Sequence, residues 1–167
     1  MAEITLLPLD RTAAESLAAD PVAFADRHEL LLAPYEAIAV EIAVLTADML
    51  AKTGATMPWV GYLTLEGTQR HVVGTCGFKG GPDTSGTSEI AYFTFPQEEG
   101  RGIATKMALA LVQLVSEVQP ELAALRAHTL PERNASFRVL EKAGFQYVVP
   151  VVDPEDGPVW RLERPLL

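Results

Sequence analysis

The sequence predicts one α/β domain over residues 1–167, and three observations lead to this fold class. Residues 88–105 form a well-buried strand pattern that passes through a short turn with two glycines directly into a helical pattern. Two apolar strand patterns separated by a turn precede this unit, and helical periodicity dominates the segment before residue 53. The chain is long enough to bury one sizeable core, and it contains no repeat or linker that would divide it.

The composition of the chain argues against several classes of function. The formal charge of −9 argues against general affinity for nucleic acid, which depends on clustered Lys and Arg. No apolar run approaches the roughly 20 residues that span a bilayer, so we expect no membrane partner. Cys76 is the only cysteine, which excludes an internal disulfide and suits a reducing compartment. With no signal-peptide pattern at the N-terminus, we expect a cytoplasmic protein. The three His are scattered without ligand spacing, so no metal site is indicated.

The N-terminal part is expected to hold one strand and three helices. Residues 3–9 suggest the strand, and Pro8 favours an edge position because proline donates no ladder hydrogen bond. The expected helices are Thr12–Ala19, Val22–Leu32 and a longer one from Pro34 to about Lys52, closed by Gly54. Apolar residues of the long helix fall on one stripe, namely Ile38, Ile42, Leu45 and Met49.

The remainder is expected to alternate strands and helices. A hairpin precedes the central strand, and a helix from Ile103 to about Val118 follows it. Residues 121–129 fit a strand or a helix, and we choose a strand because prolines bound a stretch too short for a stable helix. The expected segments are strands Pro58–Glu66, Arg70–Phe78, Glu121–Thr129, Phe145–Val152 and Val159–Leu162, and a helix Asn134–Lys142.

The central turn has the features of a phosphate cradle. Gly100 and Gly102 allow a tight turn and a close approach of the backbone to a ligand. A helix that starts directly after such a turn presents unpaired N–H groups and the positive end of its dipole, an arrangement that binds phosphate. A P-loop would need Gly-Lys-Ser/Thr, and a dinucleotide fold would need a third glycine and further βαβ units. Taken alone, the turn also fits a purely structural role.

Two motifs together resemble a known family. PQEEGRGIAT resembles the acetyl-CoA-binding motif of the GCN5-related N-acetyltransferases (GNAT), and LPERNASFRVLEKAGF resembles their second CoA-contacting motif, particularly in the ribosomal-protein acetyltransferase branch. The resemblance covers roughly residues 58–164. It implies the GNAT fold, a mixed and mostly antiparallel sheet flanked by helices, whose parallel fourth and fifth strands splay apart. Acyl-CoA lies in that gap in the family.

The resemblance also implies which residues contact acetyl-CoA, the expected co-substrate. The pantetheine arm would follow the central strand, the pyrophosphate would lie on the turn, and the second motif would add one more contact. The expected residues are Tyr92, Phe93 and Thr94 on the strand, Gly100, Arg101, Gly102, Ile103, Ala104 and Thr105 at the turn, and Arg133 or Asn134. Glu99 stands where the family has Gln or Arg, and it would repel phosphate unless it turns to solvent or pairs with Arg101 or Lys106.

Amide formation from a thioester needs a base for the amine proton and a way for the thiolate to leave. Some relatives place a Glu base on the central strand, which corresponds to Glu89, and others place a base at the end of the neighbouring strand, which corresponds to His128. We favour Glu89, because it lies on the strand expected to hold the acetyl group, whereas His128 reaches across the gap. Leu140 occupies the position of the family's usual Tyr acid.

The expected activity is therefore transfer of an acetyl group from acetyl-CoA to a primary amine. The acceptor is either a protein N-terminus, to which the branch points, or a small molecule. The alternative is a non-catalytic acyl-CoA-binding or interaction module with the same fold, suggested by Glu99 and the missing Tyr. Dimers made by paired sheets are common in the family, so a homodimer is compatible with the sequence.

Overall fold

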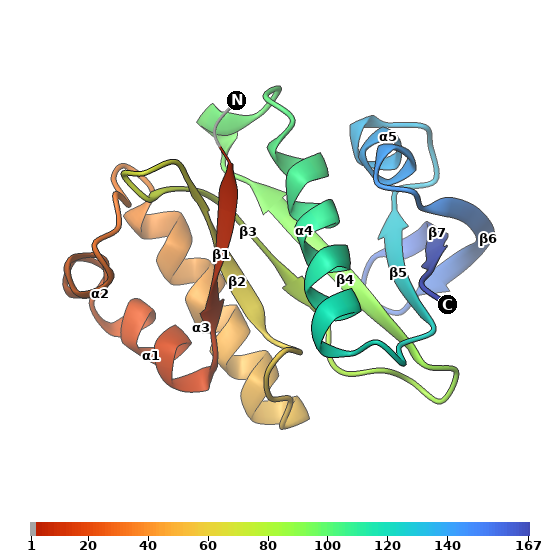
Figure 1. Cartoon of the computed structure of the whole chain (residues 1–167), viewed down its shortest axis with the longest axis horizontal. Coiled ribbons are helices and arrows are strands. Elements are labelled where there is room, and N and C mark those ends of the chain that lie inside the picture. Colours follow the sequence, from red (N-terminus) through yellow and green to blue (C-terminus); the bar gives the residue numbers. More distant parts are fainter. Residues whose placement is uncertain (1–2) are drawn as a thin grey trace.

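The computed structural model describes residues 3–167, which form one seven-stranded mixed sheet flanked by helices (Figure 1). The strands lie in the order β1-β2-β3-β4-β5-β7-β6. Their bounds are β1 Ile4–Leu9, β2 Gly61–Glu66, β3 His71–Phe78, β4 Thr87–Thr94, β5 Ala124–Thr129, β6 Gln146–Asp153 and β7 Gly157–Pro165. The helices are α1 Arg11–Ala19, α2 Pro21–His28, α3 Glu36–Thr53, α4 Ile103–Val118 and α5 Ala135–Lys142, with a 3-10 turn η1 at Pro96–Glu98.

The pairing of β4 with β5 divides the sheet. Neighbouring strands from β1 to β4 run antiparallel, as do β5, β7 and β6. The strands β4 and β5 run parallel and pair only between residues 87–89 and residues 124–126, after which they diverge. The predicted mixed sheet with splayed parallel fourth and fifth strands is thus confirmed.

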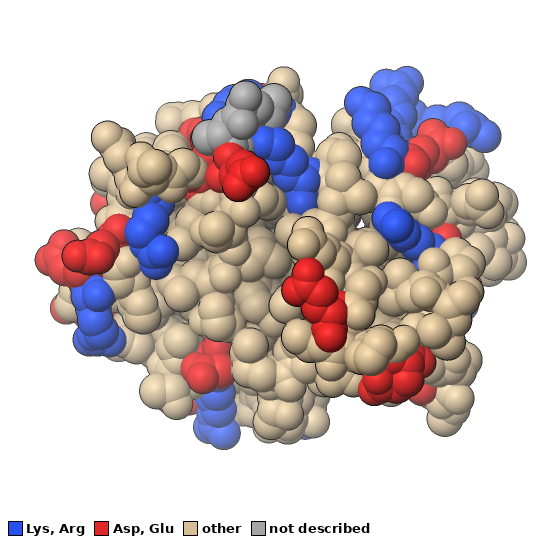
Figure 2. Space-filling model, in the orientation of Figure 1, with Lys and Arg blue, Asp and Glu red and all other residues tan. Residues whose placement is uncertain are grey.

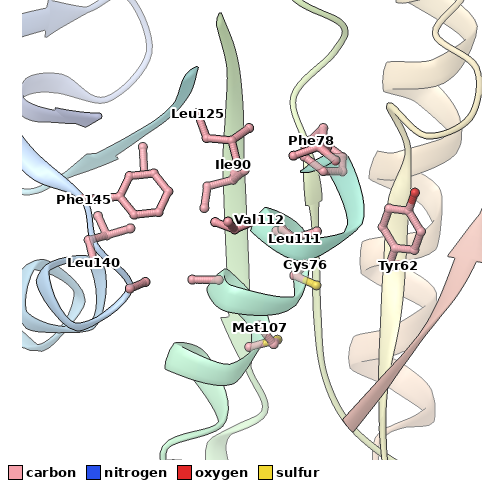
Figure 3. Close-up of a cluster of buried hydrophobic side chains, with 14 of the residues drawn as sticks. Tyr62, Cys76, Phe78, Ile90, Met107, Leu111, Val112, Leu125, Leu140 and Phe145 are labelled. Atoms are coloured by element: carbon pink, nitrogen blue, oxygen red, sulfur yellow. The ribbon is translucent and has the colours of Figure 1, made fainter. Parts of the chain in front are cut away.

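Helices cover both faces of the sheet. In Figure 1, α4 passes in front of β3 and β4, whereas α3 lies behind β1 and β2. The largest apolar cluster joins α4, α5 and the strands between them, and Figure 3 shows Leu140 and Phe145 facing Ile90 and Leu125 within it. A second cluster packs α1–α3 on β1, β2 and β3. Within residues 3–167, no helix is both long and apolar enough to cross a membrane.

Two helix boundaries differ from the sequence prediction by two residues or more. The helix α2 ends at His28 rather than Leu32, because Leu31 is extended and exchanges backbone hydrogen bonds with β3 and the residue before it. The helix α3 begins at Glu36 rather than at Pro34, with Tyr35 as its N-cap. The choice of a strand for residues 121–129 is confirmed by β5, although this strand begins at Ala124 instead of Glu121. The predicted position of Pro8 on an edge strand is confirmed by β1, which lies at the edge of the described sheet and pairs with β2.

Candidate active site

The gap between β4 and β5 leaves part of the β4 backbone facing outward from the antiparallel half of the sheet. Lys79 N–H donates to Glu89 C=O at 2.8 Å, and Phe95 N–H donates to Val73 C=O at 2.9 Å, so both β4-side groups point to β3. Alternate residues of a strand direct their N–H and C=O to opposite neighbours. The backbone groups of Tyr92 and Thr94 therefore face the gap, where β5 has already diverged.

The turn after β4 leads these groups to the start of α4. Gly100 has φ 76° and Gly102 has φ 79°, a left-handed conformation that favours glycine. A Cβ built on Gly100 would meet nothing within 4 Å, so the backbone conformation rather than space calls for glycine there. Gly102 is the N-cap of α4 and offers no side-chain cap, which leaves the first N–H groups of the helix for another acceptor.

A groove of about 720 Å³ runs along these features, and we call it the β4–β5 groove. It contains nearly all the residues expected to contact acetyl-CoA on the strand and at the turn. Its lining comprises Tyr92, Phe93, Thr94, Glu98, Glu99, Gly100, Gly102, Ile103, Ala104, Thr105, Ala135, Ser136, Arg138, Val139 and Lys142.

The side chain of Arg101 does not line this groove. Its guanidinium contacts both carboxylate oxygens of Glu66, at 2.6 and 2.9 Å, and Glu98 Oε1 at 2.7 Å. The hydrogen bond to Glu66 raises the pKa of Arg101, and Tyr35 OH donates to Glu98 at 2.7 Å. Arg101 therefore ties the glycine turn to β2. Glu66, Glu98 and His71 have the spacing of a cation site, but the guanidinium already engages both carboxylates.

The second motif contributes different side chains from those expected. Asn134 caps α5 by accepting the Phe137 N–H at 2.9 Å, and the Arg133 guanidinium lies 5.0 Å from the Phe137 ring centroid. Neither residue lines the β4–β5 groove, whereas Arg138 and Lys142 do. Their spacing of four residues, on the helix face away from buried Phe137, is the sequence signal that identifies them.

Basic side chains accordingly gather at one end of an acidic protein. Figure 2 shows Lys and Arg over the upper ends of α4 and α5, on either side of the space between these helices. Glu99 also lines the β4–β5 groove and is exposed, and Arg101 pairs with Glu66 and Glu98 instead of with it. An anion in the groove would thus meet helix N–H groups and two cations, with the Glu99 carboxylate beside them and the Glu98 carboxylate already paired with Arg101.

Glu89 and His128, the two candidate bases, touch each other. His128 Nδ1 lies 3.2 Å from Glu89 Oε2, and Lys79 Nζ lies 3.0 Å from the same oxygen. Arg161 Nε donates to His128 Nε2 at 3.2 Å, so the proton of a neutral imidazole is assigned to Nδ1, the nitrogen that faces Glu89. Both His128 nitrogens are then engaged. The structure thus brings the two candidate bases into contact, and which of them accepts the amine proton stays a prediction.

A second groove, of about 350 Å³, lies on the α3 side of the sheet, and we call it the α3 groove. Its floor crosses three strands through Gly61, Gly77 and Ala91, which are paired in register. Tyr92 and Phe93 line both grooves, so the two meet at β4. Its lining comprises Leu9, Ile42, Leu45, Thr46, Met49, Gly61, Tyr62, Thr75, Cys76, Gly77, Phe78, Lys79, Ala91, Tyr92 and Phe93.

Leu140 and Tyr92 occupy the two positions near the gap where a proton donor could be expected. Leu140 is fully buried in the core, so the family's Tyr position contributes only apolar contacts. The Tyr92 hydroxyl lies 2.8 Å from Ser136 Oγ and so links β4 to α5 across the gap. Burial raises the pKa of Tyr92, which keeps this phenol protonated at neutral pH.

Comparisons with known proteins identify a matching family and solved structures with a similar fold. A family model described as an acetyltransferase (GNAT) domain matches residues 4–146. The aminoglycoside acetyltransferase AAC(6')-Ib, solved with coenzyme A and kanamycin, is 19% identical with a TM-score of 0.63 over 98% of this chain and 95% of that chain. A chimera of Vibrio cholerae spermidine N-acetyltransferase SpeG and hSSAT is 15% identical with a TM-score of 0.67, over 98% and 96%. The ribosomal L7/L12 acetyltransferase RimL, solved with coenzyme A, is 14% identical with a TM-score of 0.64, over 98% and 94%. Such identities show a shared fold, and the comparison with curated proteins gives no match.

Proposed function

Because the chain belongs to the GNAT family of acetyltransferases, we propose that it transfers the acetyl group of acetyl-CoA to a primary amine. The observation that carries this proposal is the continuity of the β4–β5 groove, which runs from unpaired β4 backbone to the uncapped start of α4. Coenzyme A or acetyl-CoA is present in several solved structures with this fold. A long ligand with an amide-rich arm and a pyrophosphate matches both ends of the groove.

The β4–β5 groove suits acetyl-CoA part by part. Gap-facing backbone groups of Tyr92 and Thr94 would hydrogen-bond the pantetheine amides, as an added strand does. The N–H groups from Gly102 to Thr105 would hold the pyrophosphate, which needs little help from side chains at a helix start. Arg138 and Lys142 line the same groove and would attract the phosphates.

The reaction joins the amine nitrogen to the acetyl carbon and breaks the carbon–sulfur bond of the thioester. The amine loses one proton, and the CoA thiolate leaves and takes up a proton from Tyr92 or solvent. Glu89 would accept the amine proton, directly or through a water molecule, because its recorded contacts within the described residues use Oε2 and leave Oε1 for this role. His128 would position Glu89, since its own nitrogens are engaged by Glu89 and Arg161.

The acceptor is a protein N-terminus or a small-molecule amine. Solved structures with this fold include acetyltransferases named for aminoglycosides, for spermidine and for a ribosomal protein. The splayed strands and the β4–β5 groove, which would hold acetyl-CoA, do not distinguish among these acceptors.

Release of free CoA thiol tests the proposal. Purified protein would be incubated with acetyl-CoA and a mixture of primary amines, and the thiol followed with a chromogenic reagent. We expect steady amine-dependent release, with the acetylated amine found by mass spectrometry. Glu89→Gln should reduce release, and Glu117→Gln, in the exposed last turns of α4, is the matched control. Tight CoA binding without release would favour the binding-module alternative, and absence of CoA binding would contradict the proposal.

A further inference from the structure

We propose that the α3 groove receives the acceptor and selects a primary amine carried on an uncharged apolar chain or ring, rather than a polycation. This inference rests on the proposed acetyl transfer and specifies its second substrate. The shared chemistry has two sources, a free arylalkyl or alkyl amine and a polypeptide whose first residue has an apolar side chain.

The position of the α3 groove is the first argument. Tyr92 and Phe93 line it together with the β4–β5 groove, so a molecule in one groove ends where a molecule in the other begins. Ala91 and Phe93 alternate with Tyr92 and thus share a face of β4 with Glu89. An amine at the end of the α3 groove would therefore lie beside both the thioester and the carboxylate.

Three small residues on neighbouring strands leave space at the floor of the α3 groove. Gly61 is paired with Gly77, and Gly77 with Ala91, so no side chain longer than a methyl group rises along this row. A Cβ on Gly77 would lie 2.7 Å from Val60 O and 2.8 Å from Gly61 Cα, which leaves no space for a larger residue there. The volume of about 350 Å³ is at the lower end of small-molecule sites and fits one apolar side chain or ring.

The wall supplied by α3 is apolar and only partly covered. The helix packs on its neighbours through small Ala39 and Ala43, which turns the adjacent stripe of Ile42, Leu45 and Met49 along the groove. Leu45 is 69% exposed, and Phe93 on the opposite wall is 37% exposed. An apolar ligand that covers these side chains removes apolar surface from water, which contributes favourably to the free energy of binding.

Charge in the α3 groove argues against a polycation. Lys79 is the one charged residue among those that line it, and the carboxylate nearest to Lys79 by measured contact is Glu89, 3.0 Å away. Within the groove itself, a second ammonium of a polyamine would therefore lie on apolar surface or near Lys79, both of which are unfavourable. The carboxylates of Asp153 and Asp156 act on Lys79 from outside the groove lining. A single amine next to Glu89, with an uncharged tail toward Leu45, avoids this cost.

The test compares acceptors at fixed saturating acetyl-CoA. The panel is 2-phenylethylamine, tripeptide amides that begin with leucine or with glycine, and spermidine, each followed by thiol release. We expect kcat/KM for 2-phenylethylamine or the leucine peptide to exceed that for spermidine at least about tenfold, the range that apolar pockets give for small differences in fit. The leucine and glycine peptides separate the side chain from the N-terminal amine, and 2-phenylethylamine separates a free amine from a peptide.

Two neighbouring substitutions on α3 locate the selection. Leu45→Asp places a charge on the wall of the groove, whereas Val44→Asp makes the same change at a 53% exposed residue outside the groove lining. We expect Leu45→Asp to lower kcat/KM for the apolar acceptor about tenfold or more, and Val44→Asp to leave it unchanged. CoA affinity, measured by calorimetry, should be the same in both variants.

The outcomes separate this inference from the proposed function. Preference for spermidine over both apolar acceptors, or equal effects of Leu45→Asp and Val44→Asp, would overturn the inference while acetyl transfer still stands. No thiol release with any amine would instead overturn the proposed function itself. A preference for apolar amines that Leu45→Asp removes and Val44→Asp keeps would support both.

Discussion

The two grooves that meet at β4 are built in different ways. The β4–β5 groove is made largely of backbone, with the splayed strand edge, two glycines of positive φ and the start of a helix. The α3 groove is made of side chains from α3 and from three strands, above a row of small residues. A site made of backbone groups can keep its ligand when neighbouring side chains are substituted, whereas the ligand specificity of a site made of side chains changes with them.

We therefore expect the proposed CoA groove to depend little on side-chain identity, and the proposed acceptor groove to determine which amine binds. The glycine turn is held by Arg101, whose guanidinium joins Glu98 to Glu66 of β2, so the backbone that would contact phosphate is fixed from behind. Among the residues that line the α3 groove, Lys79 pairs with Glu89, whereas the wall supplied by α3 presents mainly apolar side chains that border open space. The junction between the two grooves is the place where a single change should have the largest effect.

Glu89→Gln tests the carboxylate on the same face of β4 as Phe93, beside the junction of the two grooves. The variant keeps shape and hydrogen bonding but removes basicity, so kcat should fall about 10²- to 10⁴-fold at neutral pH. Rising pH should partly rescue it by supplying deprotonated amine, and CoA affinity should not change. His128→Gln should have a smaller effect, because His128 positions Glu89 through the 3.2 Å contact. Near wild-type kcat in both variants, over a pH series, would leave solvent as the proton acceptor.

Gly102→Val addresses the backbone-built groove. A branched residue at φ 79° is strained, and its side chain would lie where the pyrophosphate is expected to approach. A side chain that displaces the turn from its CoA-binding conformation at a cost of about 1–3 kcal/mol should weaken CoA binding, measured by calorimetry, roughly 5- to 150-fold. Gly157→Val, at φ 73° in the first residue of β7, is the matched control. Equal losses of CoA affinity in both variants would indicate general destabilisation instead of a phosphate site.

Charge reversal on α5 decides between the expected and the observed basic contacts. Arg138→Glu together with Lys142→Glu should weaken CoA binding about fivefold at low salt, because two screened attractions become repulsions. Arg133→Glu should have less effect, since Arg133 stacks on Phe137 outside the β4–β5 groove. The measurement is the CoA dissociation constant at two ionic strengths. A larger effect from Arg133→Glu would restore the contact expected from the motif.

Glu99→Gln should have the smallest effect. Glu99 is exposed and lines the β4–β5 groove without pairing to Arg101. Removing a solvent-screened like charge near phosphate should tighten CoA binding about twofold, with the fold unchanged. Competition titrations on the two proteins measure a difference of this size. Weaker binding would mean that Glu99 organises the turn and that the repulsion argument fails.

The sequence by itself determined the features that depend on neighbouring residues. The strand at residues 88–95, the glycine turn and α4 follow from local patterning, positive φ and 3.6-residue periodicity, which act over a few residues. The turn and the start of α4 were predictable as a phosphate cradle for this reason, whereas the contacts on β4 were expected from the resemblance to the GNAT family. Arg138 and Lys142 were also within reach, through their spacing on α5, although the motif comparison pointed to Arg133 and Asn134 instead.

Only the tertiary structure decided how distant elements meet. In the sequence, the stripe of Ile42, Leu45 and Met49 looks like an ordinary apolar helix face. It borders a groove because Ala39 and Ala43 pack inward and because Gly77 has no side chain to fill the space. The side chain of Arg101 turns to Glu66, which is 35 residues away, and Glu89 meets His128 across diverging strands. Such contacts depend on the summed packing of remote segments, which no local pattern encodes.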